Sequence, residues 1–291
     1  MDANLADALT VFTAVRGRLF GIAYRMLGSA TEAEDLVQET WVRWQGTDRG
    51  AVQDPPAFLA TTTTRLAINA LQSARVRRET YIGPWLPEPV DTSQDPTLGA
   101  ERAEALGFAV LTMLERLTPT ERAAYVLREA FAYDYAQISE VVQLSEPAVR
   151  QLVSRARKHL AGERRREVGP GEQQRLLTAF LAAAKTGDLV QLERLFAEDV
   201  VSYSDGGGKV RASKFPVFGR LTVARFIHAF HTHFWQGVAE TFTEVNGQPS
   251  VLLSKDGTTF AVISLVASER GIDQVLWMMN PDKLTVISRA A

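Results

Sequence analysis

Polar side chains that can bind DNA recur at helical spacing between Ser145 and Leu160. Arginine and glutamine can form paired hydrogen bonds with the edges of guanine and adenine, whereas lysine and serine are better suited to phosphate. The polar positions of this stretch are Arg150, Gln151, Ser154, Arg155 and Lys158. An ordinary surface helix with a solvated basic face has the same pattern, and for an isolated helix that is the preferred interpretation.

The sequence around this stretch marks it as the second helix of a pair. Ser145 suits a helix N-cap, and Glu146 and Pro147 suit the first turn. The remaining positions form an apolar stripe: Val149, Leu152, Val153, Ala156 and Leu160. A short helical stretch precedes it at residues 135–142. These features predict a helix-turn-helix whose second helix packs with one side and offers the other to a major groove.

A helix expected at residues 32–44 carries a different polar face. Its apolar side is formed by Ala33, Leu36, Val37, Thr40, Trp41 and Trp44. Asp35, Gln38 and Glu39 lie on another side at helical spacing, where they are free to meet a basic protein surface. On spacing alone, a solvated helix face explains this stripe better than a binding site.

The next helix, expected at residues 56–78, has a third polar face. Arg65, Asn69, Ser73 and Arg77 follow one another at steps of four. They lie opposite Leu59, Thr63, Leu66 and Ala70. Asparagine can read base edges and arginine can hold phosphate, so this face suits a groove or an unpaired DNA strand. By itself such a face is weak support for DNA binding.

Composition limits the classes of protein that remain. The chain has 291 residues, 46% of them hydrophobic, which is enough for two or three domains with real cores. The formal net charge of -2 excludes a wholly basic nucleic-acid coat, so DNA contacts must come from local patches. The absence of cysteine excludes disulfides and thiolate metal sites. The N-terminus has neither a signal peptide nor a spanning segment, so we expect a cytoplasmic protein that needs no cofactor or membrane.

The pattern of elements divides the chain into four parts. Residues 5–79 and residues 101–163 are helical, and the proline-rich residues 80–100 between them form a linker. Residues 172–288 form an α+β module. In it two helices precede strands expected at residues 199–204, 209–212, 239–245, 251–254, 258–268 and 272–279. Hairpin turns are expected at Asp256-Gly257 and Arg270-Gly271.

The order and content of the helical motifs resemble the extracytoplasmic-function sigma factors of bacterial RNA polymerase. The resemblance rests on the stretch from Ala33 to Trp41, the helix from Phe58 to Asn69, and Leu117-Thr118-Pro119-Thr120-Glu121-Arg122 before the helix-turn-helix. It implies that residues 5–79 (sigma region 2) bind core RNA polymerase and the promoter −10 element, and that residues 101–163 (region 4) read the −35 element. Asp35, Gln38 and Glu39 then match the stretch that binds the polymerase clamp helices.

Three further motifs resemble sigma factors that carry a fused SnoaL-like extension, which has an NTF2-like cone fold. They are residues 81–90 in the linker, residues 205–210 and residues 280–284. In that group the extension modulates activity in place of a separate anti-sigma factor. The resemblance assigns an interdomain regulatory role to Trp85, Leu86, Pro87, Asp205, Gly206, Gly207, Gly208, Lys209, Asn280, Pro281, Asp282 and Lys283. Trp85, Leu86 and the neighbouring prolines form a stiff apolar segment that could rest on the third module.

Two positions depart from the family pattern. Gln143 stands where related helix-turn-helix sequences usually have glycine, which is costly if the backbone there needs a positive φ. Ser73 stands where such factors often carry aspartate, which bears on the preference for the −10 element.

Other functions stay open at this level. Residues 205–209 could be a plain hairpin turn, or Asp205 and Lys209 could pair with a partner or ligand. His228 and His231 share a helix face, but they are better explained as structural histidines than as metal ligands. SnoaL-like folds also occur as enzymes, in which an aspartate and a histidine act as an acid–base pair. Asp205 with one of the histidines is an alternative of this kind. The module would then be a ligand-binding or enzymatic domain that gates the DNA-binding part. A third alternative is a promoter-binding repressor that never recruits polymerase.

Overall fold

The computed structural model describes residues 3–93, 107–161 and 168–288, and it divides into two separately packed units. The first unit contains residues 3–79 and 110–161. The second contains residues 80–93, 107–109 and 168–288. No helix of the described residues is long and apolar enough to cross a membrane.

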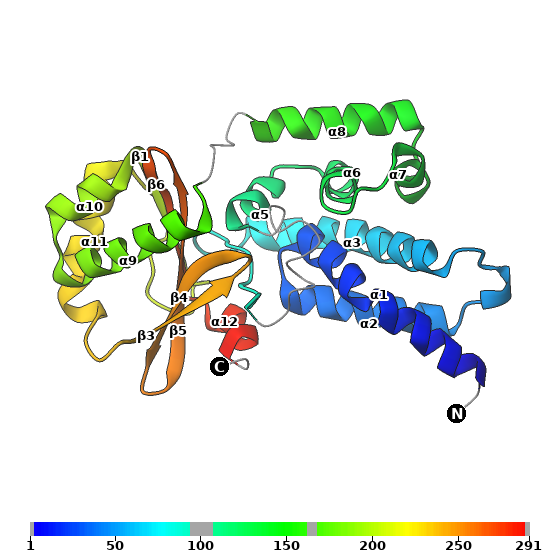
Figure 1. The fold of residues 1–291 in the computed structure, drawn as a ribbon, viewed down its shortest axis with the longest axis horizontal. Helices are drawn as coiled ribbons and strands as arrows, with labels where there is room; N and C mark the ends of the chain where they lie inside the picture. Colours follow the sequence, from blue (N-terminus) through cyan, green and yellow to red (C-terminus); the bar gives the residue numbers. More distant parts are fainter. Residues whose placement is uncertain (1–2, 94–106, 162–167, 289–291) are drawn as a thin grey trace. The chain divides into compact units, whose positions relative to one another are not determined.

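Three helices form the first part of the first unit (Figure 1). They are α1 (Ala3–Leu27), α2 (Ala30–Gln45) and α3 (Pro55–Glu79), with a short 3-10 turn, η1 (Arg49–Ala51), before α3. The side chain of Ser29 caps α2 by accepting a hydrogen bond from the amide of Glu32. The apolar side expected for α2 is buried except for Trp41, which is half-buried, and the indole of Trp44 donates to the carbonyl of Ala8 at 3.1 Å. This bond and the buried side join α2 to α1.

The second part of the first unit consists of residues 110–114 of α5 (Phe108–Leu114) together with α6 (Pro119–Glu129), α7 (Tyr135–Val142) and α8 (Glu146–Ala161). Thr118 and Glu121 form a reciprocal capping box at the start of α6, and Asp134 and Gln137 form another at α7. These caps satisfy amides that would lack partners in the first turn. The helix-turn-helix expected from the sequence is therefore present as α7 and α8.

The second unit is built around a six-stranded sheet in the order β2-β1-β6-β5-β4-β3. Its strands are β1 (Phe196–Asp205), β2 (Val217–Phe218), β3 (Ala239–Val245), β4 (Gln248–Lys255), β5 (Thr258–Ser268) and β6 (Gly271–Met278). Its helices are α9 (Pro170–Thr186), α10 (Leu189–Leu195), α11 (Arg220–Phe234) and α12 (Pro281–Ser288). All the strand pairs are antiparallel except β1 with β6.

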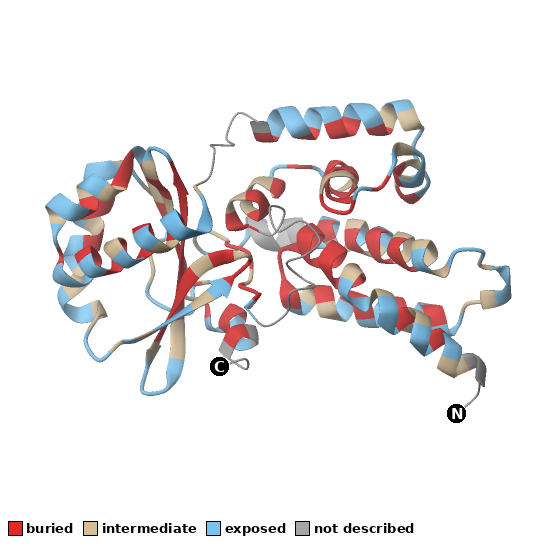
Figure 2. Cartoon of the chain, viewed as in Figure 1, coloured by how far each residue is buried: buried red, intermediate tan, exposed pale blue. Residues whose placement is uncertain are grey.

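Both faces of the sheet are covered, which explains the continuous apolar run of β5. On one face, side chains of α9, α10 and α11 pack against alternate strand residues such as Val275 and Trp277. On the other face, Leu276 and Met278 pack with residues of α12 and with Leu86 and Phe108. Figure 2 shows buried residues concentrated along the strands and on the sides of the helices that face them. This α+β module following two helical domains confirms the expected fold class.

Three details of the expected sheet were wrong. Residues 209–212 form no strand, because the amides of Lys209 and Val210 bond back to the carbonyl of Gly206 in a turn. The edge strand β2 was missed because two residues carry no readable alternation. The hairpin between β5 and β6 turns at residues 269–270, one residue earlier than expected, since Gly271 already pairs with Ser268.

Candidate functional site

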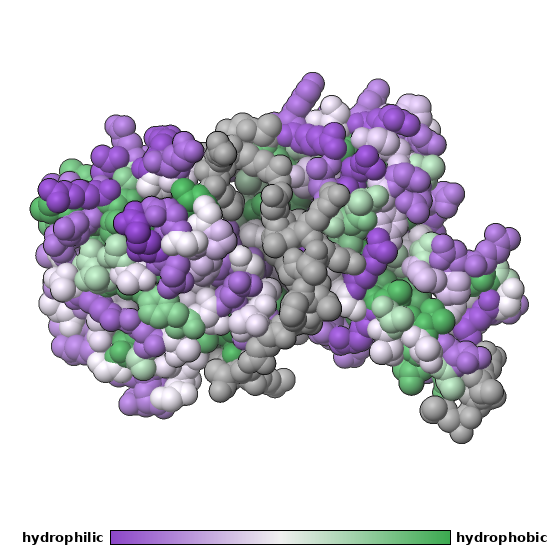
Figure 3. All heavy atoms as spheres, in the orientation of Figure 1, coloured by the Kyte–Doolittle hydropathy of each residue, from purple (hydrophilic) through white to green (hydrophobic). Residues whose placement is uncertain are grey.

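The recognition helix α8 has the two-sided character that the sequence predicts. Its expected apolar stripe is entirely buried. Arg150, Gln151, Ser154, Arg155 and Lys158 are all exposed. Hydrophilic side chains gather over α8 in the surface view (Figure 3). The structure therefore brings all five candidate base and phosphate ligands to one accessible side of one helix.

Two of these arginines are held in place by neighbours. Arg150 stacks on the ring of Tyr135 at 4.6 Å and pairs with Glu146 at 3.0 Å, so α7 and the first turn of α8 fix its direction. Arg155 lies 3.8 Å from a carboxylate oxygen of Glu121. These contacts leave the side chains exposed, and they restrict the rotamers available before a ligand binds.

The turn between α7 and α8 has the left-handed backbone that the glycine pattern requires. Gln143 ends α7 with φ 57° and ψ 44°, and its amide donates to the carbonyl of Ser139. The amide of Leu144 bonds to the same carbonyl. A non-glycine residue costs free energy in this conformation, so the departure noted in the sequence is a strained turn.

The acidic face of α2 is exposed as expected. Asp35, Gln38 and Glu39 all reach solvent, and Glu39 pairs with Arg43 at 2.9 Å. Val42 lies one turn further along the same side and is 60% exposed, although the sequence reasoning did not include it. A single exposed apolar side chain is normal on a protein surface, so Val42 by itself does not distinguish a binding surface from a solvated face.

On α3 the candidate DNA ligands divide into two groups. Asn69 and Ser73 are exposed, and the side chain of Arg77 lies outside the described residues. Arg65 instead donates from Nε to the carbonyl of Val141 at 3.0 Å and from Nη2 to the carbonyl of Glu140 at 2.8 Å. These are the last carbonyls of α7, which need partners at a helix end. Arg65 therefore joins the first three helices to the helix-turn-helix within the first unit.

A second arginine makes the same kind of connection from the other side. Arg122 of α6 is 2% exposed and donates to the carbonyl of Met26 at 2.6 Å and to Glu115 at 2.8 Å. Burial lowers the pKa of Arg122 to about 9, so the guanidinium stays charged at neutral pH. The two helical parts of the first unit are thus held together by charge-assisted hydrogen bonds to helix-end carbonyls.

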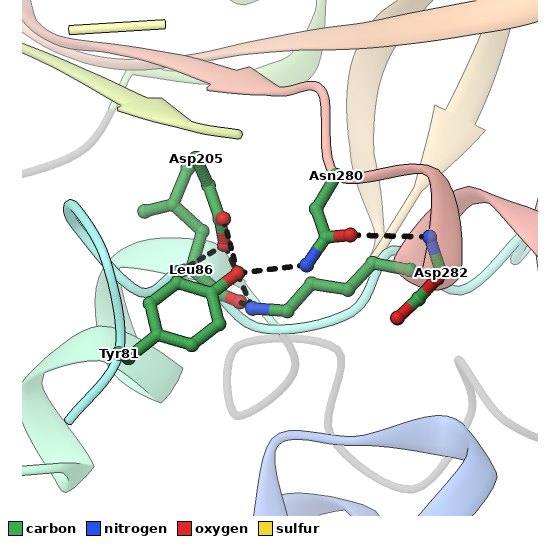
Figure 4. Close-up of polar contacts among 6 residues, drawn as sticks. Tyr81, Leu86, Asp205, Asn280 and Asp282 are labelled. Atoms are coloured by element: carbon green, nitrogen blue, oxygen red, sulfur yellow. Dashed lines mark hydrogen bonds and ion pairs between the residues drawn. The ribbon is translucent and has the colours of Figure 1, made fainter. Parts of the chain in front are cut away.

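In the second unit, the three sequence motifs meet at one buried group, the carboxylate of Asp205 (Figure 4). Its Oδ2 accepts a hydrogen bond from the amide of Leu86 at 2.8 Å and an ion pair from Lys283 at 2.7 Å. Its Oδ1 accepts from the hydroxyl of Tyr81 at 2.5 Å, and that hydroxyl also accepts from Asn280 at 2.8 Å. We call Tyr81, Leu86, Asp205, Asn280 and Lys283 the linker clamp.

Ion pairing and burial shape the linker clamp. Asp205 and Lys283 are both buried, and a buried pair persists only when its remaining polar atoms are satisfied. Lys283 also donates to the carbonyl of Leu86 at 2.5 Å and lies 4.3 Å from the ring of Trp85. Burial, and then the hydrogen bond to Asp205, raise the pKa of Tyr81 above its usual value, so the tyrosine stays a donor.

Glycines allow the motif around Asp205 to approach the linker. A Cβ at Gly207 would lie 2.3 Å from the amide nitrogen of Asn280, and one at Gly208 would lie 2.9 Å from Ile82. Both glycines have positive φ. Lys209 pairs with Asp282 across the same junction. The sequence left open whether residues 205–209 are a plain turn or whether Asp205 and Lys209 pair with partners. Both side chains form ion pairs within the module, and residues 206–209 also form a turn.

A second set of contacts fastens the linker to the end of the sheet. The amide of Val90 donates to the side chain of Asn246, whose own amide donates to the carbonyl of Val90, both at 2.9 Å. Thr92 bonds to Glu244 and accepts from the amide of Gly247. Asn246 and Gly247, both with positive φ, form the turn between β3 and β4. An Asn-Gly pair is a readable hairpin signal that the sequence reasoning overlooked.

The chain beyond the linker is held by the same module. Leu86 and Phe108 are 1% and 0% exposed, and both belong to the core on the α12 face of the sheet. Phe108 is the first residue of α5, whose later residues pack in the first unit. The sequence did not single out Phe108 or the side chain of Tyr81, because their importance depends on contacts with residues far away in the chain.

The histidines take no part in the linker clamp. His228 donates from Nδ1 to the carbonyl of Gly187 at 2.7 Å, and His231 donates from Nδ1 to the carbonyl of His228. The partners of the Asp205 carboxylate among the described residues are Tyr81, Leu86 and Lys283, so the acid–base pair with a histidine is not formed. No group of histidines and acids within the described parts of the chain could hold a metal ion.

Comparisons with known proteins place these elements. Residues 11–77 match the family model described as Sigma-70 region 2, and residues 107–160 match Sigma-70, region 4. The chain is 37% identical over 288 residues to "ECF RNA polymerase sigma factor SigJ" of Mycobacterium tuberculosis, covering 94% of this chain and 92% of that protein. It is 30% identical over 274 residues to "Probable ECF RNA polymerase sigma factor SigI" of the same species, covering 92% of each.

A solved structure agrees over nearly the whole length. The crystal structure of the M. tuberculosis extracytoplasmic function sigma factor SigJ superposes with a TM-score of 0.78 at 33% identity. The match covers 96% of this chain and 98% of that one, so it includes the C-terminal module.

Proposed function

Because the chain belongs to the extracytoplasmic-function (ECF) sigma factors, which direct promoter-specific transcription initiation, we propose that its C-terminal module restrains initiation by holding the chain on both sides of residues 94–106. In this proposal residues 5–79 bind core RNA polymerase and the −10 element, residues 101–163 read the −35 element, and residues 172–288 regulate. The observation that carries it is the burial of Leu86 and Phe108 in one core of the module.

The proposed roles of the exposed faces follow from their chemistry. Asp35, Gln38 and Glu39 of α2 would bind basic surface on the polymerase. The five polar residues of α8 would read the −35 element. Asn69, Ser73 and Arg77 of α3, together with Arg65, would contact the −10 element. Arg65 would do so only after it leaves α7, because its guanidinium donates to two carbonyls of α7 in this structure.

The length of the promoter supports a restraining role for the module. The −10 and −35 elements are separated by about 25 base pairs, or about 85 Å of duplex at about 3.4 Å per base pair. The two helical parts must span this distance together with the chain that joins them. While Leu86 and Phe108 lie in the same core, that chain cannot extend, even though its residues could reach about 3.3 Å each when free. Opening of the linker clamp would therefore favour promoter engagement.

The test is initiation by the purified full chain with core polymerase. Lys283→Met removes the cation that pairs with Asp205 and leaves a side chain of similar length. We expect this variant to give several-fold more run-off transcript than the natural chain at equal concentration. Arg270→Met is the matched control, because it breaks an exposed ion pair with Asp199 in the same module and does not touch the linker. Equal output from all three chains would exclude restraint by the linker clamp.

The polymerase surface has its own test. A chain with Asp35, Gln38 and Glu39 replaced by alanine should fail to copurify with core polymerase and should lose initiation. The control is Glu34→Ala, which removes another acid of α2. This acid pairs with Arg16 of α1. Normal initiation by the triple variant would refute the assignment of this face to the polymerase.

A further inference from the structure

The outer edge of the module's sheet carries a surface whose chemistry is unlike the rest of the chain. Residues 209–221, which we call the edge segment, contain four cationic side chains and no acidic one. The absence of acids continues along α11 to residue 239. In a chain with a net charge of -2, this stretch is a strong local concentration of positive charge.

The edge segment also exposes aromatic side chains. Phe215 and Phe218 are 77% and 64% exposed, the highest values among the large hydrophobic side chains of the described residues. Val210 and Leu221 are exposed beside them in sequence. Large apolar side chains at such exposure, interleaved with cations, indicate a binding surface rather than a solvated loop.

The fold leaves the phenylalanine and cationic side chains of this segment exposed, although the backbone at Ser213 and Lys214 lies close to Gly83 of the linker. It leaves the end of β1 and returns as β2, which pairs Val217 and Phe218 with Ser202 and Val201 and is the last strand at that side of the sheet. Phe218 shares a face with Val201, because paired residues of neighbouring strands point to the same side. The edge segment therefore lies at the rim of the module, where no further strand of the described residues pairs with β2.

Most of its charge is available to a ligand. Lys209 pairs with Asp282, and Arg220 donates to the carbonyl of Phe196 at 3.0 Å. Arg211 and Lys214 are exposed, and no carboxylate of the described residues pairs with either of them. The segment thus offers two unneutralised cations between two groups whose charge is partly satisfied.

We infer that the edge segment is a binding site for single-stranded DNA. Cations that track a phosphate backbone, with aromatic rings on which unpaired bases stack, are the combination that such strands require. A second copy of the chain would place like charges opposite one another, which disfavours self-association through this surface. The inference rests on the proposed function, because initiation supplies melted promoter strands near the protein.

The binding test uses the full chain and a fluorescent thymidine oligonucleotide of about twelve nucleotides, a length within the usual site size of about 4–16 nucleotides. Phe215→Ala with Phe218→Ala should weaken binding by about tenfold or more, since each stacked base contributes substantially. The control is Phe242→Ala, an exposed phenylalanine on β3 at the opposite edge of the sheet. It should bind as the natural chain does.

The charge test uses the salt dependence of the same binding. Arg211→Ala with Lys214→Ala should reduce the slope of log affinity against log salt by about 1.4, because each phosphate contact on a single strand contributes about 0.7. Arg194→Ala with Lys255→Ala removes two exposed cations elsewhere in the module and should leave the slope unchanged. Crosslinking of a bromodeoxyuridine oligonucleotide should label the peptide that contains Phe215 and Phe218.

Several results would overturn the inference. The first is oligonucleotide binding that neither double variant weakens, and the second is an equal loss in the control variants. The third is crosslinking only outside the edge segment. The fourth is a double phenylalanine variant that changes the oligomeric state without changing oligonucleotide affinity. A loss as large for duplex as for single-stranded DNA in the phenylalanine variant would exclude stacking. Failure of the natural chain to initiate with core polymerase would refute the proposed function instead, and the oligonucleotide measurements would not depend on it.

Discussion

Replacement of Lys283 by methionine should release the linker from the module to a predictable extent. The ammonium of Lys283 lies 2.7 Å from Asp205 Oδ2 and 2.5 Å from the carbonyl of Leu86, and both partners are buried. Removal of one member of a buried ion pair costs about 3–5 kcal/mol, because the other charge stays uncompensated. Asp205 would keep its hydrogen bonds from Leu86 and Tyr81, which places the cost near the lower limit, about 3 kcal/mol.

Hydrogen exchange at the amide of Leu86 measures this cost directly. That amide donates to Asp205, so it exchanges only when the linker clamp opens. A loss of about 3 kcal/mol corresponds to roughly 150-fold faster exchange, at about 1.36 kcal/mol for each factor of ten. The bond itself remains in the Lys283→Met variant, so the same amide reports on both chains.

The control for this measurement is Arg270→Met. The ion pair of Arg270 with Asp199 is about half exposed on both sides, and such pairs contribute about 0–1 kcal/mol. Exchange at Leu86 should therefore change by less than about fivefold. Exchange in Lys283→Met within threefold of the natural rate, or equal acceleration in the control, would refute the view that this buried ion pair holds the linker.

Three further predictions concern single side chains. Gln143→Gly should raise the free energy of unfolding by about 1 kcal/mol in denaturant titrations, because glycine adopts the left-handed turn without the steric cost; an unchanged midpoint would contradict this. Arg150→Ala should weaken binding to −35 duplex by about 1–3 kcal/mol. Arg157→Ala should not, because Arg157 pairs with Glu129. Equal loss on scrambled DNA in the Arg150→Ala variant would indicate a phosphate contact instead. The pKa of Tyr81 is raised in the folded chain, so the stability that the protonated tyrosine contributes is present below about pH 10 and is lost as the pH rises further. Above about pH 10 the free energy of unfolding should therefore fall more steeply in the natural chain than in Tyr81→Phe.

The sequence was sufficient where a local pattern decides the structure. The stripe on α8 and the buried side of α2 follow from helical periodicity, and both are present. The sequence raised a left-handed backbone at Gln143 only as a condition, and the structure shows that the condition holds. The two-residue strand β2 was not readable, since tertiary contacts rather than propensity decide such short segments, and the turn at residues 206–209 was readable only as one of two alternatives.

The linker clamp depends on contacts that periodicity does not encode. Tyr81 and Asn280 are 199 residues apart, and Leu86 and Asp205 are 119 apart. The motifs around Asp205 and Asn280 could be recognised in the sequence, but their convergence on one carboxylate could not. Likewise, the sequence assigns Arg65 to DNA alone, whereas in the structure its guanidinium donates to two carbonyls of α7.

The most direct test of the central claim is to lock the linker onto the module. The chain contains no cysteine, so a pair introduced as Ile82→Cys and Gly208→Cys would form the sole disulfide. A Cβ at position 208 lies 3.1 Å from the Cβ of Ile82, close to the separation of about 3.5–4.5 Å that a disulfide needs. Run-off transcription with core polymerase would use a promoter selected by the natural chain from random DNA. We predict little transcript from the oxidised chain and recovery on reduction, with no such response in either single-cysteine chain. Equal transcript from the oxidised and reduced forms would contradict control of initiation through the linker.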